Sequence, residues 1–406
     1  MSRHREFGSA RLFGKAEHAG ATAPVPPAHG AGASLCARGP SPAPLRAYAR
    51  RDILLRGKAR NHHDRKFEKM IGSVTLKNYG PIRSLFWEHM GQMNLVLGTN
   101  GQGKTFLLKA LYTATRTLEE YKRGNDNRNV SDILADKLYW TFQVDRLGEL
   151  VTKGEADPLS FKMNVDNREF AYRFGKDTTK QISILENAVA PRANNSIFIP
   201  AKEVLSLHQI ILKSREQDKV FGFDDTYYDL ARAIRQMPQR GKNYKAFSES
   251  RKKLENLLGG KVEFVEGNGR WQFKAHNQRY SIGATSEGIK KISILDTLLS
   301  NRYLDNKSIV FIDEPESALH PTAISSFLDI VAELSKCGIQ FFFATHSYFV
   351  VKKLYLLALE TGQSVPVISA DGDGWNINDL QDGLPENPII DESVRLYERE
   401  VELSLK

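Results

Sequence analysis

A glycine-rich stretch that ends in a lysine and a threonine is the part of this sequence best suited to hold a charged ligand. It reads Gly98-Thr99-Asn100-Gly101-Gln102-Gly103-Lys104-Thr105. Glycines let consecutive backbone N–H groups point inward around a polyphosphate, because they carry no Cβ to block its approach. The Lys104 ammonium would contact the terminal phosphates, and the Thr105 hydroxyl would bind Mg²⁺. The stretch therefore predicts a site for a nucleoside triphosphate and its magnesium ion.

The elements on either side of this stretch are those needed to position a phosphate. Residues 93–97 (Met-Asn-Leu-Val-Leu) form a short apolar run that is typical of a buried strand. A helical pattern begins at Lys104 and continues to about Arg123. The N-terminus of a helix carries a partial positive charge, so we expect this helix to direct it at the bound phosphates.

A second apolar strand ends in two carboxylates that suit the other half of such a site. Residues 307–312 precede Asp313 and Glu314. A strand that is apolar on both faces is typical of a buried parallel sheet, and charged groups at its carboxyl end lie where ligands bind. We expect Asp313 to hold Mg²⁺ beside Thr105, and Glu314 to be the general base that orients the attacking water.

A histidine follows the next apolar strand in the same way. Residues 339–344 (Ile-Gln-Phe-Phe-Phe-Ala) lead through Thr345 to His346, and residues 321–336 between the two strands have the pattern of an amphipathic helix. A strand–helix–strand unit of this kind places its two strands in parallel, with their carboxyl ends at one edge of the sheet. We therefore expect His346 near Glu314, where it would sense the terminal phosphate.

With these residues assembled, the chain resembles ABC-type P-loop ATPases of the branch that includes RecF, SMC and OLD-like proteins, many of which are labelled AAA family ATPases. Residues 313–321 (D-E-P-E-S-A-L-H-P) are similar to that branch's Walker B motif and D-loop, and residues 344–347 (A-T-H-S) to its H-loop. Ser286-Glu287-Gly288 is similar to the S-x-G of the ABC signature. It departs from the L-S-G-G-Q of transporters, which argues against a transporter subunit.

The resemblance implies ATP and Mg²⁺ as cofactors and an ATP-dependent homodimer. Each ATP would lie between the phosphate loop of one subunit and Ser286 and Gly288 of the other. Glu314 and His346 would be the catalytic residues. Gln143, which follows a predicted strand, is our choice for the Q-loop glutamine that would also contact the metal.

The resemblance further implies an α/β fold: a P-loop NTPase with the mixed sheet of ABC-type ATPases, an antiparallel β subdomain and a helical insertion. The local patterns agree with this description. They predict antiparallel strands over residues 138–145, 159–164 and 168–174, helices within 201–260, and a hairpin over 261–274. We expect an ATPase domain over residues 70–359, with an inserted lobe at about 201–282.

Residues 1–69 are rich in Ala, Arg, Gly and Pro and are predicted to be disordered. They fit a basic arm for nucleic acid, an organellar leader, or upstream sequence read through to a start at Met70; we favour the last. This segment holds 14 Lys and Arg against 5 Asp and Glu, which leaves 43 of each in the rest of the chain. The net charge of +9 thus lies in this segment, and charge does not support nucleic-acid binding by the folded part, although such binding stays possible.

Residues 360–406 are expected to form a hairpin and a helix packed on the ATPase domain. Asp371-Gly372-Asp373-Gly374 has the D-x-D spacing of a metal site, but a hairpin turn is the better interpretation. A helix over residues 391–405 follows, which leaves no room for a nuclease domain after it. An effector, if there is one, would then be a separately encoded chain.

The remaining bulk properties are ordinary. The 406 residues contain two cysteines, which suggests a reducing compartment, and no apolar run predicts a membrane span, so a cytoplasmic protein is expected. We interpret the chain as an ATP-hydrolysing dimerisation switch that acts in DNA repair or antiviral defence. The alternative is an ATP-dependent scaffold or regulator of a separate effector with little turnover. A small-molecule kinase is disfavoured by the Walker B and D-loop residues.

Overall fold

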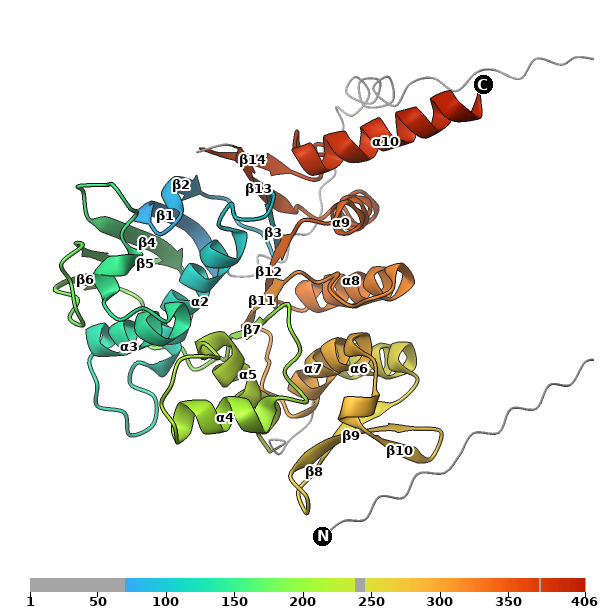
Figure 1. Cartoon of the computed structure of the whole chain (residues 1–406), viewed down its shortest axis with the longest axis horizontal. Coiled ribbons are helices and arrows are strands. Elements are labelled where there is room, and N and C mark those ends of the chain that lie inside the picture. The colour runs from blue at the N-terminus through green and yellow to red at the C-terminus, as the bar shows by residue number, and fades with distance from the viewer. Residues whose placement is uncertain (1–69, 238–244, 372–373, 406) are drawn as a thin grey trace, which may run out of the picture. The chain divides into compact units, whose positions relative to one another are not determined.

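The computed structural model describes residues 70–237, 245–371 and 374–405, all within one compact unit, Asn61–Lys406 (Figure 1). The predictions for residues 1–69 lie outside this part of the chain. A six-stranded sheet with strand order β14-β13-β3-β12-β11-β7 forms its centre. The strands are β3 (Met93–Leu97), β7 (Ile197–Ile199), β11 (Ile309–Asp313), β12 (Gln340–Thr345), β13 (Pro366–Asp371) and β14 (Gly374–Asp379). All neighbours are parallel except β13 and β14, so the sheet is mixed.

The parallel strands are apolar on both faces, as their sequences predict. In β11, Val310 and Ile312 join the core on one face, and Ile309 and Phe311 join the core on the other. The phenylalanines of β12 divide in the same way. Because successive side chains of a strand point to opposite faces, each of these strands ties two hydrophobic cores together.

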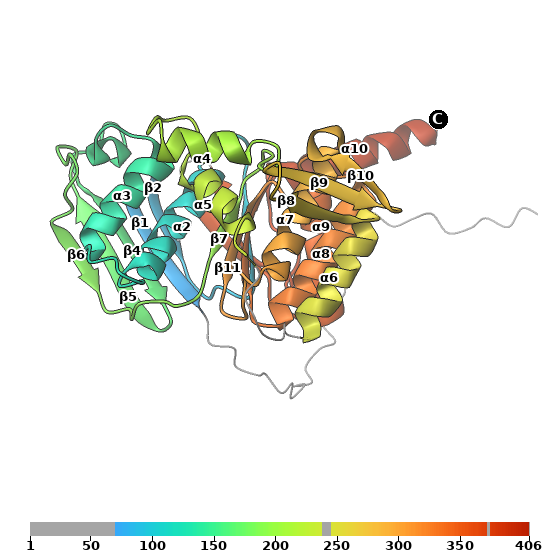
Figure 2. The same cartoon turned by 90° about the horizontal axis from the view of Figure 1, so that it is seen from below.

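A five-stranded antiparallel sheet, with order β2-β1-β4-β5-β6, faces one side of the central sheet across helix α2 (Lys104–Glu120) (Figure 1, Figure 2). Its strands are β1 (Ile71–Tyr79), β2 (Ile82–Trp87), β4 (Leu159–Val165), β5 (Arg168–Phe174) and β6 (Ile184–Asn187). Strand β4 alternates between buried and more exposed residues, which is the pattern of a sheet with one face on the core. Buried residues of both sheets and of α2 form one hydrophobic cluster.

Helices cover the other side of the central sheet (Figure 2). They are α6 (Lys245–Leu258), α7 (Glu287–Ser300), α8 (Pro321–Lys336) and α9 (Tyr348–Thr361). Helix α8 has the predicted bounds and connects the parallel strands β11 and β12. Among the described residues, none of the helices is long and apolar enough to cross a membrane.

The interval between β7 and α7 holds the expected helical insertion. It contains α4 (His208–Glu216), α5 (Asp225–Ile234), α6 and a sheet of β8 (Lys261–Val265), β9 (Arg270–Ala275) and β10 (Gln278–Ser281). The predicted hairpin is the β8–β9 pair. Buried residues of these elements belong to the same cluster as those of α7 and α8, so the insertion packs onto the main core.

The strand predicted over residues 138–145 is wrong, because this segment ends a helix, α3 (Val130–Phe142). The Asn129 side chain caps the helix by accepting a hydrogen bond of 2.8 Å from the Asp132 amide. Leu134, Leu138 and Thr141 are buried at helical spacing. The aromatic run that ends this helix favours a strand by local propensity, and the cap and the packed helical face outweigh that preference.

The C-terminal hairpin is part of the central sheet, since β13 pairs in parallel with β3, the strand that leads into the glycine-rich loop. Asp371 pairs with Gly374 across the hairpin, and residues 372–373 lie outside the described part of the chain. Helix α10 (Pro388–Ser404) follows and buries Ile390. It begins three residues before the predicted start at 391, because Asn387 accepts a hydrogen bond from the Ile389 amide and Pro388 suits the first turn.

Candidate nucleotide site

The loop between β3 and α2 has the backbone that a phosphate cradle needs. Gly101 and Gly103 have φ angles of 83° and 86°, a region that side chains with a Cβ rarely adopt. A Cβ on Gly103 would lie 3.2 Å from Pro81, so the turn between β1 and β2 closes against the loop. The Gln102 side chain accepts a hydrogen bond of 2.6 Å from the Thr99 amide, which fixes the loop from within.

The Lys104 ammonium lies inside this loop. Its Nζ donates hydrogen bonds to the backbone oxygens of Gly98 and Thr99 at 2.7 and 2.9 Å. Burial lowers the pKa of Lys104, and the carboxylates of Asp313, Glu314 and Glu316 oppose that shift. The cation is thus held where the loop's own carbonyls and the acidic end of β11 meet.

Thr105 and Asp313, which are distant in sequence, meet at the edge of the central sheet. The Thr105 hydroxyl lies 3.1 and 3.0 Å from the two carboxylate oxygens of Asp313. Burial raises the pKa of Asp313, the hydrogen bond from Thr105 lowers it, and the Glu314 charge adds to the rise. Hydroxyl and carboxylate oxygens are the ligands that Mg²⁺ prefers, so this pair suits a magnesium ion bound with phosphates.

Glu314 and His346 converge at the same edge, because β11 and β12 are parallel neighbours. His346 Nδ1 lies 3.3 Å from a Glu314 carboxylate oxygen and 3.8 Å from one of Glu316. Glu314 has a φ of 46°, in the left-handed region, and its amide donates to the Ala344 oxygen at 2.8 Å. Both side chains are partly exposed, so a bound molecule can reach them.

Ser286 and Gly288 lie at the start of α7 rather than in the phosphate loop. Ser286 is exposed, and its hydroxyl accepts a hydrogen bond of 3.3 Å from the Ile289 amide, which caps the helix. A Cβ on Gly288 would lie 2.9 Å from the Ala318 oxygen and 3.0 Å from the Leu319 side chain. The helix start therefore packs closely against residues 317–319, which follow β11.

A family model described as "AAA domain, putative AbiEii toxin, Type IV TA system" matches residues 93–352. The chain belongs to this AAA-domain family. The family match and the mixed sheet with its antiparallel partner sheet identify an ABC-type P-loop ATPase fold, as the sequence motifs indicated. Among curated proteins, no sequence matches this one.

Several solved structures are similar to this AAA domain at a distance. The SMC head bound to the C-winged helix domain of ScpA is 14% identical, with a TM-score of 0.47 over 76% of this chain and 97% of that one. The SMC head domain from Thermotoga maritima is 14% identical, with a TM-score of 0.40 over 76% and 98%. The SMC head domain bound to the C-terminal domain of ScpA from Pyrococcus furiosus is 12% identical, with a TM-score of 0.46 over 81% and 99%. Similarity this low says nothing of what the present chain binds.

Gln143 does not follow a strand in this AAA domain, so that part of the prediction is wrong. It ends α3 with a φ of 52°. With its amide oriented to suit its neighbours, the side-chain oxygen accepts hydrogen bonds from the amides of Gly222 and Asp224 at 3.1 and 3.2 Å. These contacts tie Gln143 to the loop before α5, and its contact with a metal ion stays a prediction.

Three charged residues beside the site belong to none of the sequence motifs and were not predicted. Lys109 Nζ, one turn after Thr105 on α2, lies 2.6 Å from the Asp224 carboxylate at the start of α5. Lys291 on α7 donates to the backbone oxygen of Glu314 and lies 3.4 Å from that of Asp313. Burial lowers the pKa of Lys291 to about 8, against the opposing charges of three carboxylates. Helical spacing from Thr105 could have identified Lys109, whereas nothing in the sequence relates Lys291 or Asp224 to the site.

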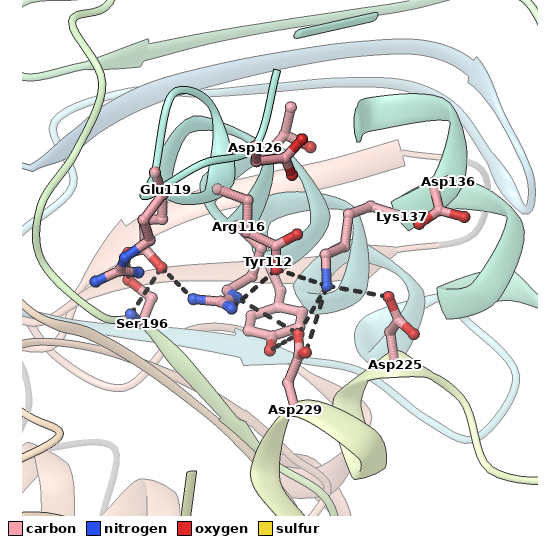
Figure 3. A network of polar contacts seen from close by, with 12 residues as sticks. Tyr112, Arg116, Glu119, Asp126, Asp136, Lys137, Ser196, Asp225 and Asp229 are labelled. Carbon is pink, nitrogen blue, oxygen red and sulfur yellow. Dashed lines mark hydrogen bonds and ion pairs between the residues drawn. The ribbon is translucent and has the colours of Figure 1, made fainter. Parts of the chain in front are cut away.

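A buried network of charged groups lies between α2, α3 and α5 (Figure 3). Lys137 Nζ lies 3.1 Å from a carboxylate oxygen of Asp225 and 3.1 Å from one of Asp229. The Tyr112 hydroxyl donates to Asp229 at 2.8 Å, and Arg116 Nε lies 3.4 Å from the same carboxylate. Burial raises the pKa of Asp225, whereas Lys137 and Arg116 outweigh burial at Asp229 and lower its pKa. The network joins the helix after the phosphate loop to α3 and α5.

Proposed function

We propose that this protein binds ATP with Mg²⁺ and hydrolyses it. The observation that carries the proposal is the meeting of Thr105, Asp313, Glu314 and His346 at the carboxyl edge of three neighbouring parallel strands. Ligands of open α/β sheets bind at this edge. A phosphate loop, an oxygen pair for magnesium, a carboxylate and a histidine are groups that can bind the phosphates and the metal there and orient the attacking water.

In this proposal the loop amides and the Lys104 ammonium hold the phosphates, and Thr105 and Asp313 hold magnesium, which would neutralise phosphate charge. The Glu314 carboxylate accepts the proton of the attacking water. His346, whose Nδ1 lies 3.3 Å from Glu314, orients that carboxylate and, when doubly protonated, donates from Nε2 to the terminal phosphate. The Asp313 carboxylate accepts a hydrogen bond from the Thr105 hydroxyl, so it is held for the metal and leaves Glu314 as the base.

We further propose that two copies close around ATP, so that Ser286 and Gly288 of one copy contact the nucleotide of the other. The exposed Ser286 at the N-terminus of α7 supports this part, since a helix N-terminus attracts phosphate. ATP binding would favour closure and hydrolysis would release it. A cytoplasmic role in DNA repair or antiviral defence is part of the proposal, and the family's description as a putative toxin fits the defence role.

A mixing experiment tests the shared site. Ser286→Ala removes the contact made to the other copy's nucleotide, and Glu314→Gln removes the base of a copy's own site. Each variant alone is expected to be inactive. A heterodimer of the two regains one intact site, because the intact Glu314 and the intact Ser286 meet in it. Random mixing then returns about a quarter of the parental turnover; no recovery would contradict the shared site.

A second measurement distinguishes an ATPase that acts on nucleic acid from an ATP-dependent scaffold or regulator. ATP turnover is measured with and without DNA, at protein concentrations on both sides of dimer formation. Strong stimulation supports work on nucleic acid. A flat, very low rate with tight ATP binding would favour the scaffold or regulator, whose effector is another chain.

A further inference from the structure

Two adjacent lysines near the start of α7 make different contacts although both are largely buried. Lys290 Nζ lies 2.7 Å from Glu287, three residues earlier on the same helix. Lys291 instead reaches out of its helix to the end of β11, where its Nζ donates to the backbone oxygen of Glu314 and lies 3.4 Å from that of Asp313. Lys291 therefore joins α7 to the end of β11, whereas the ion pair of Lys290 with Glu287 lies within α7.

The backbone that Lys291 holds is the part that aims the proposed base. Glu314 has a φ of 46°, in the left-handed region that residues with a Cβ adopt uncommonly. Its amide is held on one side by the Ala344 oxygen at 2.8 Å. Its carbonyl is held on the other side by Lys291. Between them, these two hydrogen bonds fix the peptide groups on both sides of the Glu314 Cα and direct the side chain towards His346.

We infer that Lys291 is a positioning residue, which holds Glu314 in its catalytic orientation and makes that orientation depend on the position of α7. This inference rests on the proposed ATP hydrolysis. Lys291 lies five residues after Ser286, or about 7.5 Å along the helix axis. A shift of α7 when Ser286 meets the other copy's nucleotide therefore moves the lysine that holds this copy's base. Each site of the dimer would thereby respond to the nucleotide in the other site.

Burying the Lys291 ammonium costs free energy unless hydrogen bonds and opposite charges compensate for its lost hydration. Lys291 is only 9% exposed, and a buried ammonium loses its hydration. Two backbone oxygens and the carboxylates of Asp313, Glu314 and Glu316 offset that loss. A methionine would fill the same space without the charge, but it would leave the Glu314 carbonyl without this partner.

The test compares Lys291→Met with Lys290→Met, its matched control on the same helix. For each full-length variant, ATP affinity is measured by equilibrium binding and kcat by steady-state turnover. Lys291→Met is expected to bind ATP within about twofold of the parent and to lose about 10- to 100-fold in kcat, because small misplacements of a base have effects of this size. Lys290→Met keeps the parental kcat. Lys291→Arg, which keeps the charge and donors, recovers part of the loss.

The inference is overturned if Lys291→Met turns over ATP within twofold of the parent, or if Lys290→Met loses as much. Should Lys291→Met fail to fold, Lys291→Leu replaces it, since leucine also leaves the Glu314 carbonyl without this donor. If both variants lose cooperative unfolding or ATP binding, the lysine serves folding and the positioning role is wrong. A parent without any ATP turnover would instead refute the proposed function itself, so the two failures are distinguishable.

Discussion

Replacing Lys137 by methionine is expected to destabilise the fold strongly, because its ammonium is the shared partner of buried carboxylates. Lys137 is 5% exposed and lies 3.1 Å from an oxygen of Asp225 and 3.1 Å from one of Asp229. Each contact is worth about 5 kcal/mol of Coulomb energy at an effective dielectric constant near 20. The loss of hydration by the three buried groups cancels much of this, and removing one partner of a buried pair typically costs about 3–5 kcal/mol.

The free energy of unfolding, measured with urea, is therefore expected to fall by about 3–5 kcal/mol in Lys137→Met. Lys162→Met is the matched control, because Lys162 pairs with Glu169 while their side chains are 56% and 42% exposed. That surface pair should contribute less than about 1 kcal/mol. Adding Asp225→Asn to Lys137→Met should restore part of the loss, since it removes a buried charge left without its partner. A loss below about 1 kcal/mol in Lys137→Met, as for an exposed ion pair, would contradict this stabilising role of the Lys137 ammonium.

Three further predictions follow from single contacts. Lys104→Ala should lower ATP affinity by about 100-fold or more, as measured by equilibrium binding, because the loop loses its cation; parental affinity would contradict the phosphate site. In Gly288→Ala the added Cβ would lie 2.9 Å from the Ala318 oxygen, so the start of α7 must shift, and the ATP-dependent dimer should be lost in sedimentation. Gly283→Ala, whose nearest described neighbour would be the Ser281 hydroxyl at 3.9 Å, should keep the dimer. Burial lowers the pKa of His208, so the unfolded chain takes up a proton first and stability should fall as the pH drops below 6.5. His208→Phe should reduce that slope in urea unfolding, and an unchanged slope would assign it to other groups.

The meeting of Thr105, Asp313 and His346 at one edge of the sheet could be predicted from sequence because each of them follows an apolar strand. Parallel strands that are apolar on both faces bring their carboxyl ends to one edge, so Asp313 and His346 could be placed beside Thr105 without coordinates. The bounds of α8 followed from the Pro321 start and from apolar spacing. In these cases, residue types and the expected parallel pairing of the strands were sufficient for the prediction.

The remainder depends on side-chain reach and on packing, which local sequence does not encode. Lys291 looks like an ordinary helix lysine, and only the tertiary structure brings it to the Glu314 carbonyl. The end of α3 has the composition of a strand, but packing of the buried face of this segment against α2 stabilises the helix instead. Gln143 was misplaced for that reason, because its predicted position depended on the strand that precedes it.

Glu314 is expected to activate water for ATP hydrolysis, and the variant Glu314→Gln separates that step from ATP binding. The amide keeps the size of the carboxylate but cannot accept the proton, so ATP binding and the ATP-dependent dimer should persist. Single-turnover hydrolysis of ATP, measured with enzyme in excess, should fall by about 100-fold or more, within the range for loss of a general base. Hydrolysis at the parental rate in Glu314→Gln would contradict the assignment of the base.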